Sequence, residues 1–281
     1  MGGSKRMRNS QIEVQPLTAV IGAEISGVDL RKPMDEATYE DIRAALLEHL
    51  VIFFRDQDIT KDQHLEFGRR FGVLHQHPSA PAIDGNPELM MIHGDANSPF
   101  VEGTTWHTDV SSDEEPPMAS ILHLTTVPKV GGDTLFSNMY AAYDALSDTM
   151  KAMLDPLTAL HTSDIHVGRY EQIGGGLRRA EHPRAEHPVI RTHPETGRNL
   201  IYVNQPFTKH IVGMKPAESK ALLEFLYDHC GSPHFQCRFR WQPNSIAFWD
   251  NRCAQHLATW DYYPETRSGI RVTVKGERPF H

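Results

Sequence analysis

The sequence predicts a mainly β protein with helices, in which a double-stranded β-helix (jelly-roll) core is flanked by helices. From residue 88 onward, short apolar strands recur at intervals and are separated by Pro and Gly, as in two-layered β proteins. Helical patterns are confined to the first part of the chain and to two later interruptions. The sequence contains no internal repeat and no block of like charge, so it does not suggest a repeat protein or an extended coil.

Residues 1–10 carry positive charges without the apolar stretch of a secretory signal, so we expect a disordered tail followed by a single domain over residues 11–281. Ile12–Val28 is predicted to form strand and turn. Asp35 is placed to cap a helix over Glu36–Leu50. Val51–Arg55 follows as a buried strand. Thr60 and Gln63 form a capping box for a second helix that ends at Gly72.

The remaining elements follow from short apolar runs. The predicted strands are Leu89–His93, Ala119–Thr126, Asp133–Ser137, Val189–Thr192, Leu200–Asn204, Phe235–Trp241, Ile246–Trp249 and Ile270–Lys275. Helices are predicted over Tyr140–Leu154 and Pro216–His229, the second with proline in its first turn. The Gly-rich stretch over residues 163–184 is predicted to form a mobile loop that closes over a site as a lid.

The composition excludes some functions. A formal net charge of −8 argues against nucleic acid or an anionic membrane as the main partner. The longest fully apolar run, Leu50–Phe54, is far too short to span a bilayer. Cys230, Cys237 and Cys253 are odd in number and lack metal-binding spacing, so we expect reduced thiols in a cytoplasmic protein. The 17 histidines favour a metal site.

His107 and Asp109 form the central motif. In an extended strand alternate side chains share a face, so this imidazole and this carboxylate would converge. Such a pair suits a divalent metal, and a second imidazole would complete a 2-His-1-carboxylate site for Fe(II). A His-x-Asp triplet is expected about once by chance in a chain with this many His and Asp, and His93 with Asp95 forms another. The motif alone therefore does not establish a metal site, and further candidate ligands elsewhere in the sequence are needed.

His256 is the candidate third ligand, since a jelly roll brings distant strand ends together. Asp250 and Asn251, shortly before it, are more typical of a turn than of a ligand set. Arg267 and Arg271 follow, the second within an alternating strand. A buried arginine calls for a carboxylate or sulfonate, which its planar fork grips with two hydrogen bonds; alternatively, both arginines pair with surface acids.

Taken together, these motifs resemble the taurine dioxygenase family, Fe(II)- and 2-oxoglutarate-dependent oxygenases that include aryloxyalkanoate dioxygenases. The similarity extends over nearly the whole chain. It rests on the segments IGAEISGVDLRKP (21–33), VIFFRDQ (51–57), RRFGVLHQHP (69–78), WHTDV (106–110), GGDTLF (131–136), HPVIRTHPETG (187–197), VNQPFT (203–208) and WQPNSIAFWDNR (241–252), followed by His256 and Arg267.

The resemblance implies a role for each matching residue. Fe(II) would be held by His107, Asp109 and His256. The distal carboxylate of 2-oxoglutarate would be bound by Arg267 and Thr134, although Thr134 alone reads as an ordinary strand residue. The remaining matches concern the substrate: His77, Arg271 and the amide of Val110 for its anionic group, and Phe207 for an aromatic wall. Without the family, His77 would be read as part of a surface turn.

Three departures from the taurine enzymes concern the substrate pocket. Ala80 replaces a pocket tyrosine, Gly103 replaces an asparagine, and His166 with Val167 stands where the family has a serine–phenylalanine pair. We therefore expect a pocket that suits a bulkier organic anion than taurine: a sulfonate, an alkyl sulfate or an aryloxyalkanoate.

The implied reaction consumes 2-oxoglutarate and O2, yields succinate and CO2, and hydroxylates the substrate, which fragments to a carbonyl product if the hydroxylated carbon bears a leaving group. Similar enzymes are often dimers or tetramers, so a homo-oligomer is expected. Two alternatives stay open: a zinc-type hydrolase using the same three ligands, and a non-enzymatic anion- or carbohydrate-binding jelly roll whose histidines are incidental.

Overall fold

The computed structural model describes residues 12–164 and 183–281. The predicted tail over residues 1–10, the His166–Val167 pair and nearly all of the predicted lid lie outside the described residues. At the edges of that lid, the backbone N–H of Ser163 donates to the carbonyl of Pro183 (3.2 Å), and Arg184 already begins a strand. The predicted single domain over residues 11–281 stays a prediction.

The larger sheet has seven strands in the order β1-β2-β3-β13-β5-β15-β4, antiparallel except where β2 meets β3. In chain order these strands are β1 (Glu13–Pro16), β2 (Ala23–Ser26), β3 (Val51–Phe54), β4 (Leu89–Gly94), β5 (Ala119–Thr126), β13 (Ser245–Asp250) and β15 (Arg267–Val274). A three-stranded sheet, β12-β6-β14, packs against it. Its strands are β6 (Thr134–Asn138), β12 (Gln236–Phe239) and β14 (Ala254–Ala258).

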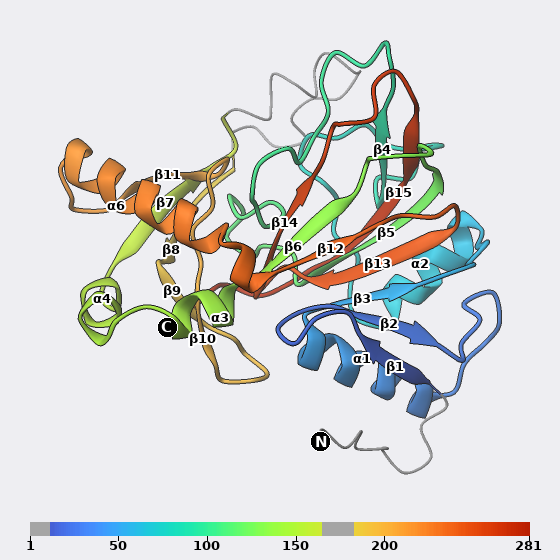
Figure 1. The fold of residues 1–281 in the computed structure, drawn as a ribbon, viewed down its shortest axis with the longest axis horizontal. Coiled ribbons are helices and arrows are strands. Elements are labelled where there is room, and N and C mark those ends of the chain that lie inside the picture. Colours follow the sequence, from blue (N-terminus) through green and yellow to red (C-terminus); the bar gives the residue numbers. More distant parts are fainter. Residues whose placement is uncertain (1–11, 165–182) are drawn as a thin grey trace.

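Two helices cover the outer face of the large sheet, α1 (Glu36–His49) and α2 (Lys61–Arg69) (Figure 1). Side chains along β3 point alternately to the two faces of the sheet. Ile52 and Phe54 pack in the core beneath these helices, while Val51 and Phe53 pack in the core between the sheets. Both faces of the strand are therefore buried, which accounts for its unbroken apolar sequence.

The other elements gather at the opposite end of the molecule (Figure 1). They are the helices α3 (Met139–Asp144), α4 (Asp148–Leu154) and α6 (Pro216–Cys230), the 3-10 turn η1 (Pro233–Phe235), the sheet β11-β7-β8 and the pair β10-β9. Their strands are β7 (Thr158–Thr162), β8 (Arg184–Pro188), β9 (Ile190–Thr192), β10 (Asn199–Ile201) and β11 (Thr208–Ile211). None of the helices in the described part of the chain has both the length and the apolar character that crossing a membrane demands.

Most predicted elements are confirmed, including the Asp35 cap, where the side chain accepts from the backbone N–H of Thr38 at 2.9 Å, and the capping box of Thr60 and Gln63. The single helix predicted over Tyr140–Leu154 is wrong. The chain forms α3 and α4 instead, because Ser147 accepts a hydrogen bond from the backbone N–H of Met150 (3.2 Å) and starts a new helix. The second helix ends at Arg69, before the predicted stop. Strands β7, β8, β11 and β14 were not predicted.

Candidate metal centre

His107 and His256 meet across a single antiparallel backbone bridge. The N–H of His256 donates to the carbonyl of His107 (2.8 Å), the reverse bond measures 3.1 Å, and the ring centroids lie 4.0 Å apart. His256 belongs to β14, at the edge of the smaller sheet, whereas His107 belongs to no extended strand. The paired backbones thus place two imidazoles side by side, although they are far apart in the sequence.

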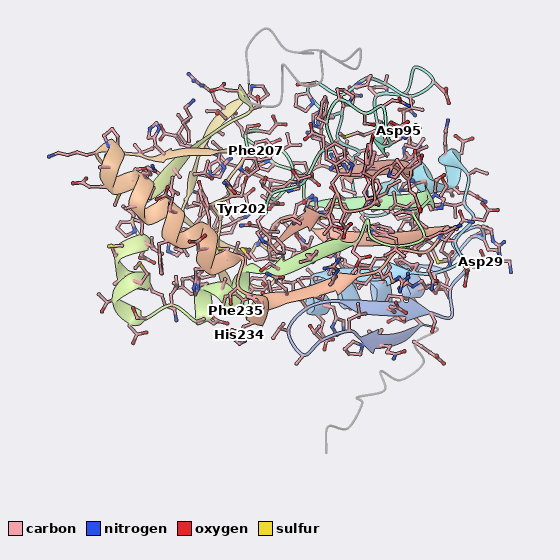
Figure 2. The ribbon with its side chains drawn as sticks, turned by 45° about the horizontal axis from the view of Figure 1, so that its top comes forward. Asp29, Asp95, Tyr202, Phe207, His234 and Phe235 are labelled. Atoms are coloured by element: carbon pink, nitrogen blue, oxygen red, sulfur yellow. The ribbon has the colours of Figure 1, made fainter. Side chains whose placement is uncertain are left out.

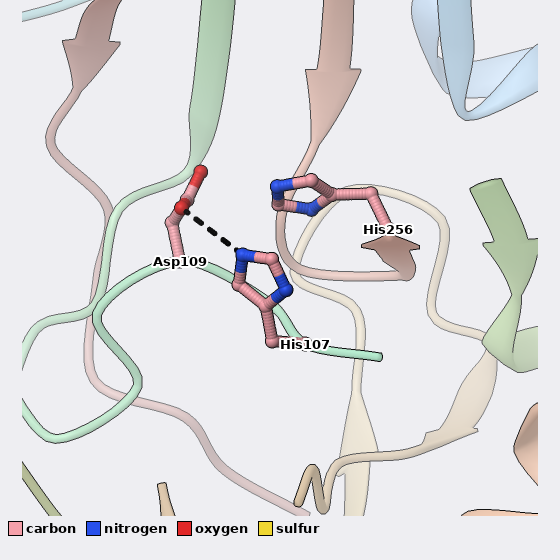
Figure 3. A group of neighbouring side chains, drawn as sticks. All are labelled: His107, Asp109 and His256. Atoms are coloured by element: carbon pink, nitrogen blue, oxygen red, sulfur yellow. Dashed lines mark ion pairs between the residues drawn. The ribbon is translucent and has the colours of Figure 1, made fainter. Parts of the chain in front are cut away.

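Asp109 reaches the same point through a turn. The prediction of a strand over residues 107–109 is wrong: a turn follows the bridge at His107, and Val110 has a φ of 49°, in the left-handed region. The convergence itself is observed, since Oδ1 of Asp109 lies 3.9 Å from Nε2 of His107 (Figure 3). The candidate ligand atoms of His107, Asp109 and His256 all lie within 4.8 Å of one another.

The protonation states suit a divalent cation. Nδ1 of His107 lies 2.8 Å from the carbonyl oxygen of Thr105, which only accepts, so Nδ1 carries the hydrogen and Nε2 offers its lone pair toward Asp109. Burial holds the pKa of His256 well below its usual value, and this ring is neutral. Burial alone would raise the pKa of Asp109, but the Arg271 guanidinium and a hydrogen bond from Ser120 hold that pKa well below its usual range. Two neutral imidazoles and one carboxylate fit Fe(II).

These three residues line one cavity of about 370 Å³. The same cavity is lined by most of the other predicted site residues: His77, Gly103, Val110, Thr134, Phe207, Arg267 and Arg271. Ala80 is buried and packs against Met90 and Ile92, which line the cavity, but it does not line the cavity itself. The structure therefore brings together residues from both sheets and from three connecting segments.

Arg267 is a buried cation without an acidic partner in the described part of the chain. Its side chain donates to the carbonyl of Gly132 (2.9 Å) and to Oγ1 of Thr134 (3.1 Å). It is 3% exposed, and burial lowers its pKa to about 10. Because Trp241 also donates to Oγ1 of Thr134 (2.9 Å), this hydroxyl accepts twice and keeps its own hydrogen for another acceptor. The arrangement is suited to an anion entering from the cavity.

Arg271 has a different environment. Its Nη1 lies 2.6 Å from Oδ1 of Asp109, and its Nη2 lies 3.0 Å from the sulfur of Met90. Its Nε is buried and has no hydrogen-bond partner among the described residues. The alternative in which both arginines pair with surface acids is therefore wrong: Arg271 pairs with a buried carboxylate, and Arg267 forms no ion pair with any acid in the described part of the chain.

His77 lines the cavity and also shapes a turn. Its Nδ1 accepts from the backbone N–H groups of Ser79 (3.1 Å) and Ala80 (2.9 Å), so in the neutral ring Nε2 carries the hydrogen. The interpretation of His77 as part of a surface turn is right about the turn, but it missed that the side chain lines the cavity. Phe207 is held by its backbone, whose N–H donates to Oδ1 of Asn204 (3.3 Å).

Two other clusters could be mistaken for metal sites. His93 and Asp95 lie at and just after the end of β4, partly exposed and away from the cavity, and Figure 2 shows Asp95 well apart from Phe207. His193, Asp250 and Cys253 form a buried group that the sequence analysis did not single out. Both carboxylate oxygens of Asp250 accept from Arg252 (2.9 and 2.7 Å), so a guanidinium already supplies the positive charge there.

Comparison with known proteins identifies the family. The model of the family described as "Taurine catabolism dioxygenase TauD, TfdA family" matches residues 13–273. The chain belongs to this TauD/TfdA family. It is 36% identical to an alpha-ketoglutarate-dependent sulfate ester dioxygenase of Pseudomonas putida, over 96% of this chain and 91% of that protein. It is 34% identical to an (S)-phenoxypropionate/alpha-ketoglutarate-dioxygenase of Sphingobium herbicidovorans, over 89% of this chain and 90% of the relative.

The fold agrees with this membership. The crystal structure of a taurine dioxygenase from Burkholderia xenovorans superposes with a TM-score of 0.82 at 41% identity, covering 96% of this chain and 92% of that chain. The jelly-roll core is confirmed, and so is the enzyme class. This TauD/TfdA member is an Fe(II)- and 2-oxoglutarate-dependent dioxygenase that uses O2. The hydrolase and the non-enzymatic module are not supported.

Proposed function

We propose that this dioxygenase oxidises a small organic sulfate ester or sulfonate whose apolar part is larger than that of taurine. The observation that carries the proposal is the placement of two buried arginines on one cavity. Arg267 and Arg271 lie four residues apart in β15, so both face the space between the sheets, roughly 13 Å apart along the strand. One cavity therefore offers separate positions for two anions, the co-substrate and the substrate.

In this proposal Fe(II) is held by His107, Asp109 and His256. Arg267 and the hydroxyl of Thr134 bind the distal carboxylate of 2-oxoglutarate, since they supply a guanidinium fork and a free O–H, and no acid of the described residues forms an ion pair with this guanidinium.

The substrate anion is bound next to the metal. Arg271 and Nε2–H of His77 donate to it, the amide of Val110 contributes, and Phe207 forms part of the wall. A guanidinium beside a metal ligand holds the substrate close enough to the metal for oxidation, and the substrate does not need to ligate the metal.

The other cavity walls favour an apolar chain. Met90, Ile92, Leu122, Phe207 and Trp249 line the cavity, and small residues stand at two of the positions where the taurine enzymes have larger ones, Ala80 and Gly103. Apolar walls gain free energy by removing hydrocarbon from water, so an alkyl chain fits better than a short polar amine. The sulfate ester activity named for the Pseudomonas putida relative supports this substrate class.

When bound, iron, 2-oxoglutarate and O2 supply the oxidation, which yields succinate, CO2 and a hydroxylated substrate. The chain's own residues place the reacting C–H bond, because an error of about 1 Å can cost about 100-fold in rate. We propose that oxidation occurs on the carbon bearing the sulfur group. The product then collapses to an aldehyde and releases sulfate from a sulfate ester, or sulfite from a sulfonate.

The test measures succinate together with sulfate and sulfite release by iron-loaded protein. The panel contains alkyl sulfates of increasing length, alkanesulfonates, taurine and aryloxyalkanoates, with Arg267→Ala and His107→Ala as controls. We expect turnover to rise with alkyl chain length and to vanish in both controls. Turnover with taurine alone, or with aryloxyalkanoates alone, would contradict the proposed substrate class.

We further propose that the protein works in the cytoplasm as a homo-oligomer. The three cysteines are buried and unpaired, and burial raises the pKa of Cys230 and Cys237 to about 12, which is consistent with inert thiols in a reducing compartment. Light scattering after size-exclusion chromatography tests the assembly, and a monomer at micromolar concentration would contradict it.

A further inference from the structure

The two oxygens of Asp109 have different partners. Oδ1 faces Arg271 (2.6 Å) and Nε2 of His107 (3.9 Å), on the side where the candidate ligands meet. Oδ2 accepts a hydrogen bond of 2.7 Å from Oγ of Ser120. Ser120 lies in β5, is fully buried, and shares the inner face of that strand with Leu122 and Leu124.

A chain of hydrogen bonds fixes the direction in which Ser120 donates. The indole Nε1–H of Trp249, which can only donate, bonds to Oδ1 of Asn251 (2.9 Å). The backbone N–H of Asp109 donates to the same oxygen (3.3 Å), so the amide Nδ2 of Asn251 faces Ser120 and donates to its Oγ (2.9 Å). The serine hydrogen is then left for the carboxylate of Asp109.

The segment that carries Asn251 is itself held in place. The backbone N–H of Arg252 donates to Oδ1 of Asp250 (2.9 Å), and the guanidinium of Arg252 donates to both oxygens of that carboxylate. The hydroxyl of Thr108 donates to the backbone carbonyl of Asn251 (2.5 Å), which ties this turn to the His107–Asp109 segment. All of these side chains are buried, so water does not compete for their hydrogen bonds.

We propose that Ser120 is a positioning residue for the metal centre. By holding Oδ2 it presents only Oδ1 to the metal, so that Asp109 binds through one oxygen and coordination positions stay open for 2-oxoglutarate and O2. The inference rests on the proposed function of His107, Asp109 and His256 as the ligands. It assigns a role to a small strand residue that neither ligates the metal nor lines the cavity.

Titration with Mn(II), followed by the EPR signal of the free ion, tests the inference without any turnover. In Ser120→Ala the carboxylate loses its donor, and we expect Mn(II) to bind about 10- to 100-fold more weakly. Ser120→Thr keeps the hydroxyl and is expected to restore binding. Should Ser120→Ala not fold, Ser120→Cys offers a similar shape with a weak donor.

Ser137 supplies the matched control. It is also fully buried in a strand, and its hydroxyl donates to the carbonyl of Cys230 (2.6 Å) rather than to a candidate metal ligand. Ser137→Ala is expected to lose folding stability comparably to Ser120→Ala while binding Mn(II) like the wild type. Equal Mn(II) affinity of Ser120→Ala and the wild type would overturn the inference. Failure of the wild type to bind Mn(II), or unchanged binding in His107→Ala, would instead overturn the proposed ligand set.

Discussion

Nη1 of Arg271 lies 2.6 Å from Oδ1 of Asp109, so the proposed substrate-binding arginine and a proposed metal ligand form one buried ion pair. A metal bound by Asp109 competes with Arg271 for the same oxygen and leaves the guanidinium more available to another anion. Metal binding and substrate binding are therefore expected to favour each other. By thermodynamic linkage the two affinities change by the same factor.

Replacement of Arg271 by alanine is expected to weaken substrate binding while leaving metal binding intact. Loss of one partner from a buried charge pair costs about 2–5 kcal/mol, so KM for the substrate should rise by about 30-fold or more. Mn(II) affinity should stay the same or increase, because Asp109 loses a competing cation. Parallel measurement of KM and Mn(II) affinity checks this. A variant that loses both would show that Arg271 shapes the metal site rather than the substrate site.

Arg267→Lys tests whether the guanidinium fork, rather than positive charge alone, binds 2-oxoglutarate. The three donors of a lysine share one nitrogen, so lysine cannot hold Gly132 and Thr134 and also donate in parallel to both oxygens of a carboxylate. We therefore expect KM for 2-oxoglutarate to rise by about 10-fold or more. The same loss should appear without catalysis. Added 2-oxoglutarate with Mn(II) should raise the melting temperature of the wild type and should have little effect on Arg267→Lys. An equal rise in both proteins would count against this role.

Gly103 is expected to be required next to His107. A Cβ added there would lie 3.1 Å from Cε1 of His107, and the residue has a φ of +79°. Gly213 has nearly the same φ, +80°, but an added Cβ would meet nothing within 4 Å. Both alanine variants should lose about 1 kcal/mol of stability through the left-handed backbone, whereas only Gly103→Ala should also weaken Mn(II) binding. Matching Mn(II) affinities of the two variants would show that the contact with His107 is harmless.

Local sequence patterns predicted the strands well where both faces of a strand are buried. The mainly apolar segments of β5 and β13 gave nearly the observed bounds, because strands that are largely buried on both faces favour apolar side chains. In contrast, β14 carries Gln255 and His256 among its five residues and has no such signal. Of these two, His256 belongs to the proposed metal centre, so the apolar pattern that identifies a strand is weak in the strand that carries a proposed ligand.

The proposed metal ligands could be singled out because His107 and Asp109 are close in the sequence and because the order of motifs resembles a known family. The contacts around them could not. The bridge between His107 and His256, the ion pair of Arg271 with Asp109 and the bond from Ser120 to Asp109 all join residues on different elements. No short-range pattern reports such pairings, and a serine within a strand carries no signal of its own. These contacts could be identified only from the three-dimensional structure.

Buried neutral histidines are expected to make the protein sensitive to acid. Burial lowers the pKa of His64 to about 3 and that of His187 to about 4, and it holds the pKa of His161 well below its usual value. In the unfolded chain each of these groups titrates near 6.5. As the pH falls below 6.5, the unfolded chain therefore binds more protons than the folded protein does. The contribution of these neutral histidines to the free energy of unfolding is fully present above pH 6.5 and decreases as the pH falls toward the pKa values of the folded state.

Between pH 7 and pH 5.5 each of these histidines should reduce the free energy of unfolding by about 1 kcal/mol. His64 contacts the carbonyl of Ile121 through Nε2 (3.1 Å), and glutamine at this position keeps a donor for that oxygen without titrating. Chemical denaturation of metal-free wild type and His64→Gln at both pH values measures the difference. The pH-dependent loss should be about 1 kcal/mol smaller in the variant, and an equal loss in both proteins would show that His64 is not neutral in the folded state.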